Sequence, residues 1–146
     1  MRRCLLDTAV FVYALGRDHP YREPCRWIVD ALGDERIAGE ASVSMVQEFA
    51  HVRRRRGGDV GRASKEARVV SGLCLLHAFE EPDLTLMLEL LAAYERLDGQ
   101  DAVFAATALN RAIDVIVSPD PAFDDVPGLE RIDPLDTARI EELALA

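Results

Sequence analysis

Lysine is almost missing from this sequence, and long apolar runs are absent. Lys65 is the only lysine among 17 basic residues, so nearly all of the positive charge belongs to arginine. No stretch approaches the roughly 20 apolar residues that a membrane-spanning helix requires. The apolar run after Arg2 and Arg3 ends at Asp7, which is too early for a secretory signal. We therefore expect a cytoplasmic protein without membrane contact.

Cysteine and histidine are also scarce. Cys4, Cys25 and Cys74 are odd in number, far apart and without a C-x-x-C motif. This pattern argues against a disulfide framework or a zinc site and is typical of a reducing compartment. His51 and His77 have no partners at the spacing of metal ligands, so neither predicts a metal site.

Acidic residues outnumber basic ones by 26 to 17, which gives a formal net charge of −9. Any contact with a nucleic acid must therefore be local, because the whole surface repels a polyanion. The 146 residues fit one domain, and no repeat, low-complexity tract or linker divides them. We expect residues 1–146 to form a single domain.

Short apolar runs alternate with longer helical patterns along the chain. The first run, Cys4 to Leu6, has no polar alternation and predicts a short strand that is buried on both faces. The other predicted strands are 36–39, 115–117 and a short one at Ile132. The predicted helices are 8–15, 21–32, 42–56, 61–79, 84–97, one that begins near 99–101 and 133–145. This order predicts a three-layer α/β/α sandwich around a short parallel sheet.

Four acids occupy comparable places in this pattern. Asp7 follows the first strand and Asp120 follows the strand 115–117, so both are expected at the carboxyl edge of the sheet. Glu48 and Asp101 lie on helices that flank these strands. The structural alternatives are that Asp7 and Asp120 only cap the helices that follow them, and the sequence leaves both open.

Four carboxylates in one cleft repel each other unless a cation neutralises them or their pKa values rise. Sites made only of oxygen ligands select hard cations, here Mg²⁺ or Mn²⁺. Such a site activates water and stabilises charge on a phosphoryl group, with one metal ion or with two.

Four blocks of the sequence resemble, in order and spacing, the four motifs of PIN domains, and most of all those of VapC-type toxins of bacterial toxin–antitoxin pairs. The blocks are Leu5-Leu6-Asp7-Thr8, Val46-Gln47-Glu48-Phe49, Asp101-Ala102-x-x-Ala105-Ala106-x-Ala108 and Val117-Ser118-x-Asp120-x-x-Phe123. The resemblance extends from Cys4 to about Pro134. It departs from the family in the fourth block, where Pro119 and Pro121 flank the acid.

The resemblance implies a metal-dependent endoribonuclease, usually a homodimer, that a small antitoxin of the VapB type holds inactive. It implies that its substrates are structured RNAs, often tRNA or ribosomal RNA. The acids that it assigns to metal binding and catalysis, with Mg²⁺ or Mn²⁺, are Asp7, Glu48, Asp101 and Asp120. Thr8 and Ser118 would be supporting hydroxyls. Asp124 is the alternative for the fourth acid.

The run Arg53-Arg54-Arg55-Arg56 ends the helix that carries Glu48. One interpretation is a solvated helix end, where cations suit the negative end of the helix dipole. The others are contact with RNA and contact with the antitoxin.

Two other functions remain open at this point. The first is a catalytically weak PIN-like module that binds RNA or protein. The second is a phosphatase of the phosphoaspartyl type, although Asp7 has no second acid two residues later. A Ser–His–Asp hydrolase is weaker still, because no serine lies in a Gly-x-Ser-x-Gly motif.

Overall fold

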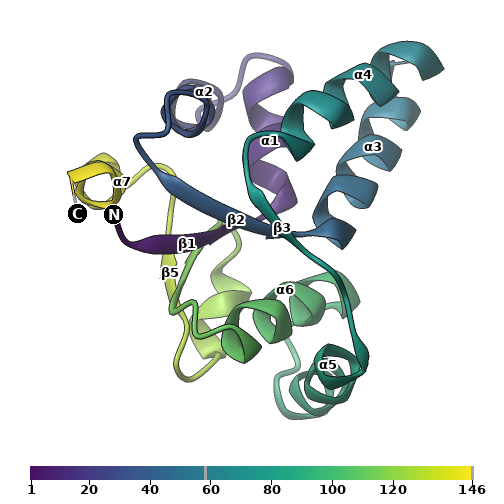
Figure 1. Cartoon of the computed structure of the whole chain (residues 1–146), viewed down its shortest axis with the longest axis vertical. Helices are drawn as coiled ribbons and strands as arrows, with labels where there is room; N and C mark the ends of the chain where they lie inside the picture. The colour runs from purple at the N-terminus through teal and green to yellow at the C-terminus, as the bar shows by residue number, and fades with distance from the viewer. Residues whose placement is uncertain (58, 146) are drawn as a thin grey trace.

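The computed structural model describes residues 1–57 and 59–145 and shows five parallel strands in one sheet (Figure 1). The strand order is β3-β2-β1-β4-β5, and every neighbouring pair is parallel. The strands are β1 (Arg3–Leu6), β2 (Ala38–Ser42), β3 (Leu75–His77), β4 (Val115–Val117) and β5 (Glu130–Ile132). This confirms the predicted α/β class with a short parallel sheet.

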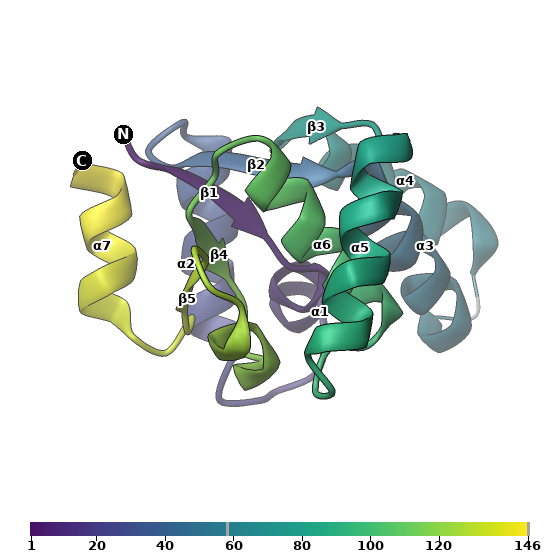
Figure 2. The same ribbon diagram turned by 90° about the horizontal axis from the view of Figure 1, so that it is seen from below.

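Helices cover both faces of the sheet and complete the three layers. Figure 1 shows α1 to α4 on one face and α5 and α6 on the other, and Figure 2 shows α7 beside α2 at the β5 edge. The helices are α1 (Thr8–Leu15), α2 (Arg22–Gly33), α3 (Val43–Gly57), α4 (Val60–Ser71), α5 (Glu81–Ala93), α6 (Gly99–Asn110) and α7 (Thr137–Leu145). A short 3₁₀ helix, η1 (Pro121–Asp125), follows β4. No helix in the described part of the chain is both long and apolar enough to cross a membrane.

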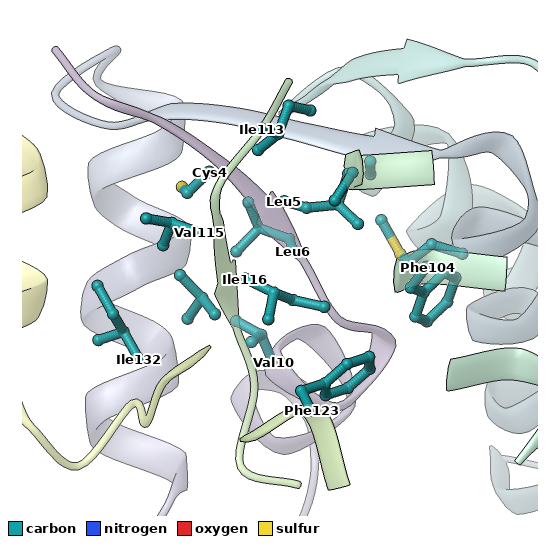
Figure 3. Close-up of a cluster of buried hydrophobic side chains, with 14 of the residues drawn as sticks. Cys4, Leu5, Leu6, Val10, Phe104, Ile113, Val115, Ile116, Phe123 and Ile132 are labelled. Atoms are coloured by element: carbon teal, nitrogen blue, oxygen red, sulfur yellow. The ribbon is translucent and has the colours of Figure 1, made fainter. Parts of the chain in front are cut away.

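The core lies between the sheet and the two helical layers (Figure 3). Residues 4–6 of β1 and 115–117 of β4 are fully buried, as expected for central parallel strands that helices cover on both faces. On the α6 side, Ala102, Ala105 and Ala106 are also fully buried, and these small side chains bring the helix close to the sheet. The core thereby holds the carboxyl ends of β1 and β4 in a fixed position.

The connections of the chain reverse direction between β1 and β4. From β1 the chain proceeds outward to β2 and β3 through α1 to α4, and then returns across the other face through α5 and α6 to β4. In open α/β sheets ligands bind beside the carboxyl ends of the strands at such a switch point. Asp7 follows β1 and Ser118 follows β4, so both lie at this place.

Two strands and three helices differ from the sequence-based prediction. The helix α5 spans Glu81–Ala93 instead of 84–97, and α7 begins at Thr137 instead of residue 133. The predicted helix 61–79 ends at Ser71, and Leu75–His77 forms the edge strand β3. The second strand lies later than predicted, at Ala38–Ser42, and includes the buried Glu40. The second strand was placed too early because Glu40, a charged residue, lies inside it and is held there by hydrogen bonds from Arg3 and His77.

Two local predictions on helices were also wrong. The helical spacing of residues 21–32 predicts Trp27 on the inner face with Ile28 and Ala31, but Trp27 is 37% exposed and the Arg36 guanidinium lies over its ring. The spacing of Ser44 and Gln47 predicts a capping box, but Ser44 lies inside α3, and its amide donates a hydrogen bond to the Ser42 hydroxyl. The helix α3 therefore begins at Val43, which points outward, while Met45 and Phe49 are buried.

Candidate active site

The carboxyl ends of β1 and β4 are joined by a hydrogen bond between side chains. Ser118 Oγ donates to Asp7 Oδ2 over 2.5 Å, and the Asp7 amide donates to the Val117 carbonyl over 3.1 Å. Asp7 is the N-cap residue of α1 by position, but its side chain makes no capping hydrogen bond. Asp7 therefore does not serve only as a cap of α1, because its carboxylate is directed to the end of β4.

Asp101 enters from α6, on the other face of the sheet. A capping box begins this helix: the Asp101 amide donates to Asp98 Oδ1 over 2.8 Å, and the Asp98 amide donates to Asp101 Oδ2 over 3.4 Å. The reciprocal bonds fix the orientation of the Asp101 side chain. Asp101 is buried although it carries no cationic partner among the described residues.

Glu48 comes from the second turn of α3 and is half-buried. Burial and the charge of Asp7 raise the pKa of Glu48, and the Thr8 hydroxyl nearby partly offsets this. The side chain of Gln100 on α6 donates to Ser44 Oγ on α3 over 3.0 Å. This bond joins the helices that carry Asp101 and Glu48, which lie on opposite faces of the sheet (Figure 1). Both acids lie close enough to Asp7 for its charge to raise their pKa values.

Asp120 caps the helix that follows it and keeps one carboxylate oxygen outside that bond. Its Oδ1 accepts from the Ala122 amide over 2.9 Å and caps η1, while its own amide donates to Ser118 Oγ over 3.0 Å. The capping bond uses one carboxylate oxygen and leaves Oδ2 available. Ser118 thus contacts both Asp7 and Asp120, which is the supporting position expected of this hydroxyl.

The two acids after Asp120 are held by arginines. Arg131 donates to both oxygens of Asp124 over 2.9 and 3.2 Å. Arg96 donates to both oxygens of Asp125 over 2.7 and 2.8 Å. These pairs favour Asp120 over Asp124 as the fourth acid of the cluster.

The pKa values of the central acids rise because the acids are buried close together. Burial raises the pKa of Asp7 to about 6, with the charge of Asp120 as a further cause and the Ser118 hydrogen bond opposing it. Burial raises the pKa of Asp101 to about 8, with further contributions from Asp98, Asp120 and Asp7. The pKa values of Asp7, Glu48 and Asp101 thus respond to neighbouring acids, and Asp120 is one of those neighbours, so the structure brings these four acids together.

The chemistry of this cluster fits a hard divalent cation. All donors are oxygen atoms, which Mg²⁺ and Mn²⁺ prefer, and the crowded charges need neutralising. The buried Thr8 Oγ1 lies near Glu48, and among the described residues it has no partner at hydrogen-bond geometry, so it is available to a hydrated ion. Among the described residues no three His, Cys, Asp or Glu side chains are already arranged as a cage. Mg²⁺ does not require one, because it retains several waters and uses one or two carboxylates.

The four arginines at the end of α3 face different surroundings. Arg53 donates to Glu66 of α4 over 2.7 Å, and both side chains are largely buried. Arg54, Arg55 and Arg56 are exposed. Arg53 therefore has a structural role between α3 and α4 in the free protein.

Comparison with known proteins identifies the family. The family model of the PIN domain matches residues 4–129. The chain belongs to the PIN-domain family. It is 39% identical over 132 residues to Ribonuclease VapC7 of Mycobacterium tuberculosis, a match that covers 89% of this chain and 90% of that protein. It is 25% identical over 134 residues to Ribonuclease VapC13 of the same organism, a match that covers 88% of this chain and 98% of that protein.

The family membership makes the chain a VapC-type PIN-domain ribonuclease, the class that forms the toxin of VapBC toxin–antitoxin systems. Ribonucleases of this class depend in general on divalent metal ions. Two solved structures share the fold. VapBC2 from Rickettsia felis bound to a promoter DNA fragment matches with a TM-score of 0.70 at 14% identity, covering 90% of this chain and 98% of that one. The sarcin–ricin loop cleaving toxin VapC20 of Mycobacterium tuberculosis matches with a TM-score of 0.67 at 14% identity. This match covers 86% of this chain and 98% of that one.

The sequence analysis missed Asp98 and the bond between Gln100 and Ser44. The signal for Asp98 was present, because an acid three residues before Asp101 at a helix start is the spacing of a capping box. The Gln100–Ser44 bond joins residues 56 positions apart. No local sequence pattern predicts a contact between residues so far apart.

Proposed function

We propose that this PIN domain, with residues 1–146 as one nuclease unit, hydrolyses RNA phosphodiester bonds at the cluster of Asp7, Glu48, Asp101 and Asp120. The observation that supports it most is the buried pair Asp7 and Asp101, whose pKa values are raised and which have no cationic partner in the described part of the chain. Such a pair does not stabilise the fold, because two buried like charges lower the stability of the protein.

The proposed roles of the side chains follow from their positions. Asp7, whose charge acts on both Glu48 and Asp101, would bind Mg²⁺ or Mn²⁺ together with Asp101, and Glu48 and Asp120 would bind it directly or through water. When bound, such an ion lowers the pKa of water and neutralises charge on the phosphoryl group. Ser118 would keep Asp7 in place through its hydrogen bond, and Thr8 would donate to a water or a carboxylate of the site. Of the arginines at the end of α3, Arg56 is proposed to contact the RNA, since Arg53 is held by Glu66.

An antitoxin is the proposed protein partner, and a homodimer is the proposed state of the chain. Several structures with this fold are toxin–antitoxin complexes, among them one from Klebsiella pneumoniae and VapBC from Salmonella typhimurium bound to DNA. By analogy we propose an antitoxin of the VapB type for this chain and action on RNA in the cytoplasm.

The substitution Asp101→Asn tests the proposal. It should abolish cleavage of total RNA in Mg²⁺ or Mn²⁺ and weaken Mn²⁺ binding in calorimetry at least about tenfold, because a neutral amide binds hard cations poorly. In chelator the same change should raise the Tm by about 2–4 °C, since one of several repelling charges is gone.

The matched control is Asp30→Asn, the same change at an exposed acid on α2. It should leave RNA cleavage, Mn²⁺ binding and Tm as they are. Normal cleavage by a folded Asp101→Asn protein would show that the site has been misplaced. A wild-type chain that binds RNA without cleaving it in either metal would favour the binding module instead.

A further inference from the structure

A groove lies between the ends of α1 and α3 that are far from the acids. It has a volume of about 730 Å³. Its walls come from the second half of α1, the turn after it and the last turns of α3. The lining residues are Val12, Tyr13, Leu15, Gly16, Arg17, Asp18, His19, Arg53, Arg56 and Gly57.

Both helices that form the groove begin at the acid cluster. Thr8 of α1 directly follows Asp7, and α3 carries Glu48 in its second turn. The two helices pack side by side, with the rings of Phe11 and Phe49 edge to face at 6.4 Å (Figure 1). Val12 is the first residue of α1 that lines the groove, and it lies four residues after Thr8, so the groove begins about 6 Å along the helix from the cluster. A chain bound at the acids reaches the groove within a few nucleotides.

The groove is locally cationic in a chain of net charge −9. Three arginines line it, against one acid, Asp18. Arg53 is held by Glu66. Arg17 and Arg56 are exposed and form no ion pair with residues 1–57 or 59–145. Two guanidinium groups are thus available to phosphates, which are the anions that guanidinium binds best.

Aromatic rings adjoin these cations. The rings of Tyr13 and His19 are nearly parallel with centroids 4.6 Å apart, and Tyr21 lies 5.1 Å from Tyr13 in a similar orientation. His19 is exposed, so the group presents a ring to the groove. Proteins that bind single-stranded nucleic acids combine such stacking rings with a positive groove.

We propose that this groove binds the single-stranded stretch of RNA next to the bond that is cleaved, with Arg17 and Arg56 on phosphates and a base stacked on His19. The inference rests on the ribonuclease function proposed above. A protein segment is the alternative occupant. It is better suited to the neighbouring groove between α3 and α4, where Val46, Ala63 and Ala67 form an apolar lining.

The four arginines at the end of α3 differ in which groove they line. Arg56 lines this groove, Arg54 lines the neighbouring one, and Arg55 lines neither of the two. Arg55 is exposed, as Arg56 is. Arg55→Gln therefore removes the same charge from the same turn of helix without touching the groove, and it serves as the matched control.

The experiment measures binding of a fluorescein-labelled, adenine-rich RNA of about 12 nucleotides, within the usual range of single-strand sites. All proteins carry Asp101→Asn so that the RNA is not cleaved. The double variant Arg17→Gln/Arg56→Gln should bind at least about tenfold more weakly and flatten the plot of log K against log salt by about 1.4, for two lost phosphate contacts. Arg55→Gln should stay within about twofold of its parent.

The stacking contact has its own measurement. His19→Ala should weaken binding of the adenine-rich RNA about fivefold or more, and should do little to an abasic RNA with the same phosphates. Equal losses for Arg55→Gln and for the double variant would overturn the groove proposal, because the charge effect would then be general. Groove variants that bind RNA normally but release a co-expressed protein partner would overturn it as well.

Failure of the groove and failure of the ribonuclease function are distinguishable. RNA cleavage by the chain with Asp101 intact, together with groove variants that bind RNA normally, would contradict only the groove. Absence of cleavage by that chain in Mg²⁺ and Mn²⁺ would contradict the proposed function, whatever the groove binds.

Discussion

Two groups of buried carboxylates in this protein differ in what surrounds them. Glu40 and Asp83 lie away from the carboxyl edge, and each is held by cations. Glu40 accepts from Arg3 and His77, and Asp83 accepts from Arg111 over 2.8 and 2.9 Å. These partners lower the pKa of both acids, with the arginine hydrogen bond as the largest cause in each case.

Asp7 and Asp101 are buried to a similar degree, but their carboxylates accept hydrogen bonds from the Ser118 hydroxyl and the Asp98 amide, and no described residue pairs a cation with either of them. Their pKa values rise to about 6 and about 8, mainly because of burial. The difference shows that burial alone does not mark a functional acid. Burial without a compensating cation does, since such a group lowers stability and is tolerated where a ligand neutralises it.

The strongest test of this difference is to remove the cation from one of the paired acids. Arg111→Met should destabilise the protein by about 3 kcal/mol, because Asp83, only 2% exposed, would keep a buried charge without its ion pair. Asn110 would still donate to it, which limits the loss. Urea unfolding measures the effect.

The control for this prediction is Arg2→Met, which removes an arginine that pairs with Asp114 and Glu130 on the surface. Its cost should be below about 1 kcal/mol. Similar losses for the two variants would show that the Asp83 pair is no more important than a surface pair.

The two groups also predict opposite effects of pH on the metal-free protein. Where the folded pKa lies above the unfolded one, as for Asp7 and Asp101, the folded state binds more protons and stability falls as pH rises toward about 8. For Glu40 and Asp83 the folded pKa lies below the unfolded one, so stability is lost as pH falls through the acidic range. Stability in chelator should therefore be greatest near about pH 5.

Thermal unfolding across this pH range, with chelator and with Mg²⁺, measures the effect. The ion should remove most of the loss above about pH 6, because it neutralises the charges that cause it. A metal-free protein that is most stable near about pH 8 would contradict the assignment of Asp7 and Asp101 as uncompensated acids.

The smallest expected effect on stability separates two acids of one segment. Asp120→Asn should change the free energy of unfolding by less than about 0.5 kcal/mol, because Asn caps a helix about as well as Asp. It should nevertheless remove most metal-dependent cleavage of RNA. Asp124→Asn, which disrupts only the exposed pair with Arg131, should retain cleavage at a cost below about 1 kcal/mol. The reverse pattern of cleavage would assign the fourth acid to Asp124.

Much of the fold followed from local patterns. The strands β1 and β4 were predictable because their residues are apolar without alternation, and α1 and α6 because small or apolar residues follow an acid at the helix start. The edge strand β3 was not predictable. It has only three residues, and its hydrogen bonds to β2 exist only once the two segments meet. Trp27 was misplaced because a helical pattern does not say how far the neighbouring layer extends.

The sequence by itself determined which acids follow which elements, since the carboxyl ends of parallel strands meet at one edge. It thereby identified Asp7, Glu48, Asp101 and Asp120 as candidates. Only the tertiary structure decided which buried acids are paired with cations, because those contacts join residues far apart in the chain, such as Arg3 and Glu40. It also decided that Arg56 faces a groove and that Arg53 is held by Glu66. The direction of a side chain at the end of a helix depends on the helix packed beside it. The run of four arginines in the sequence does not predict that packing.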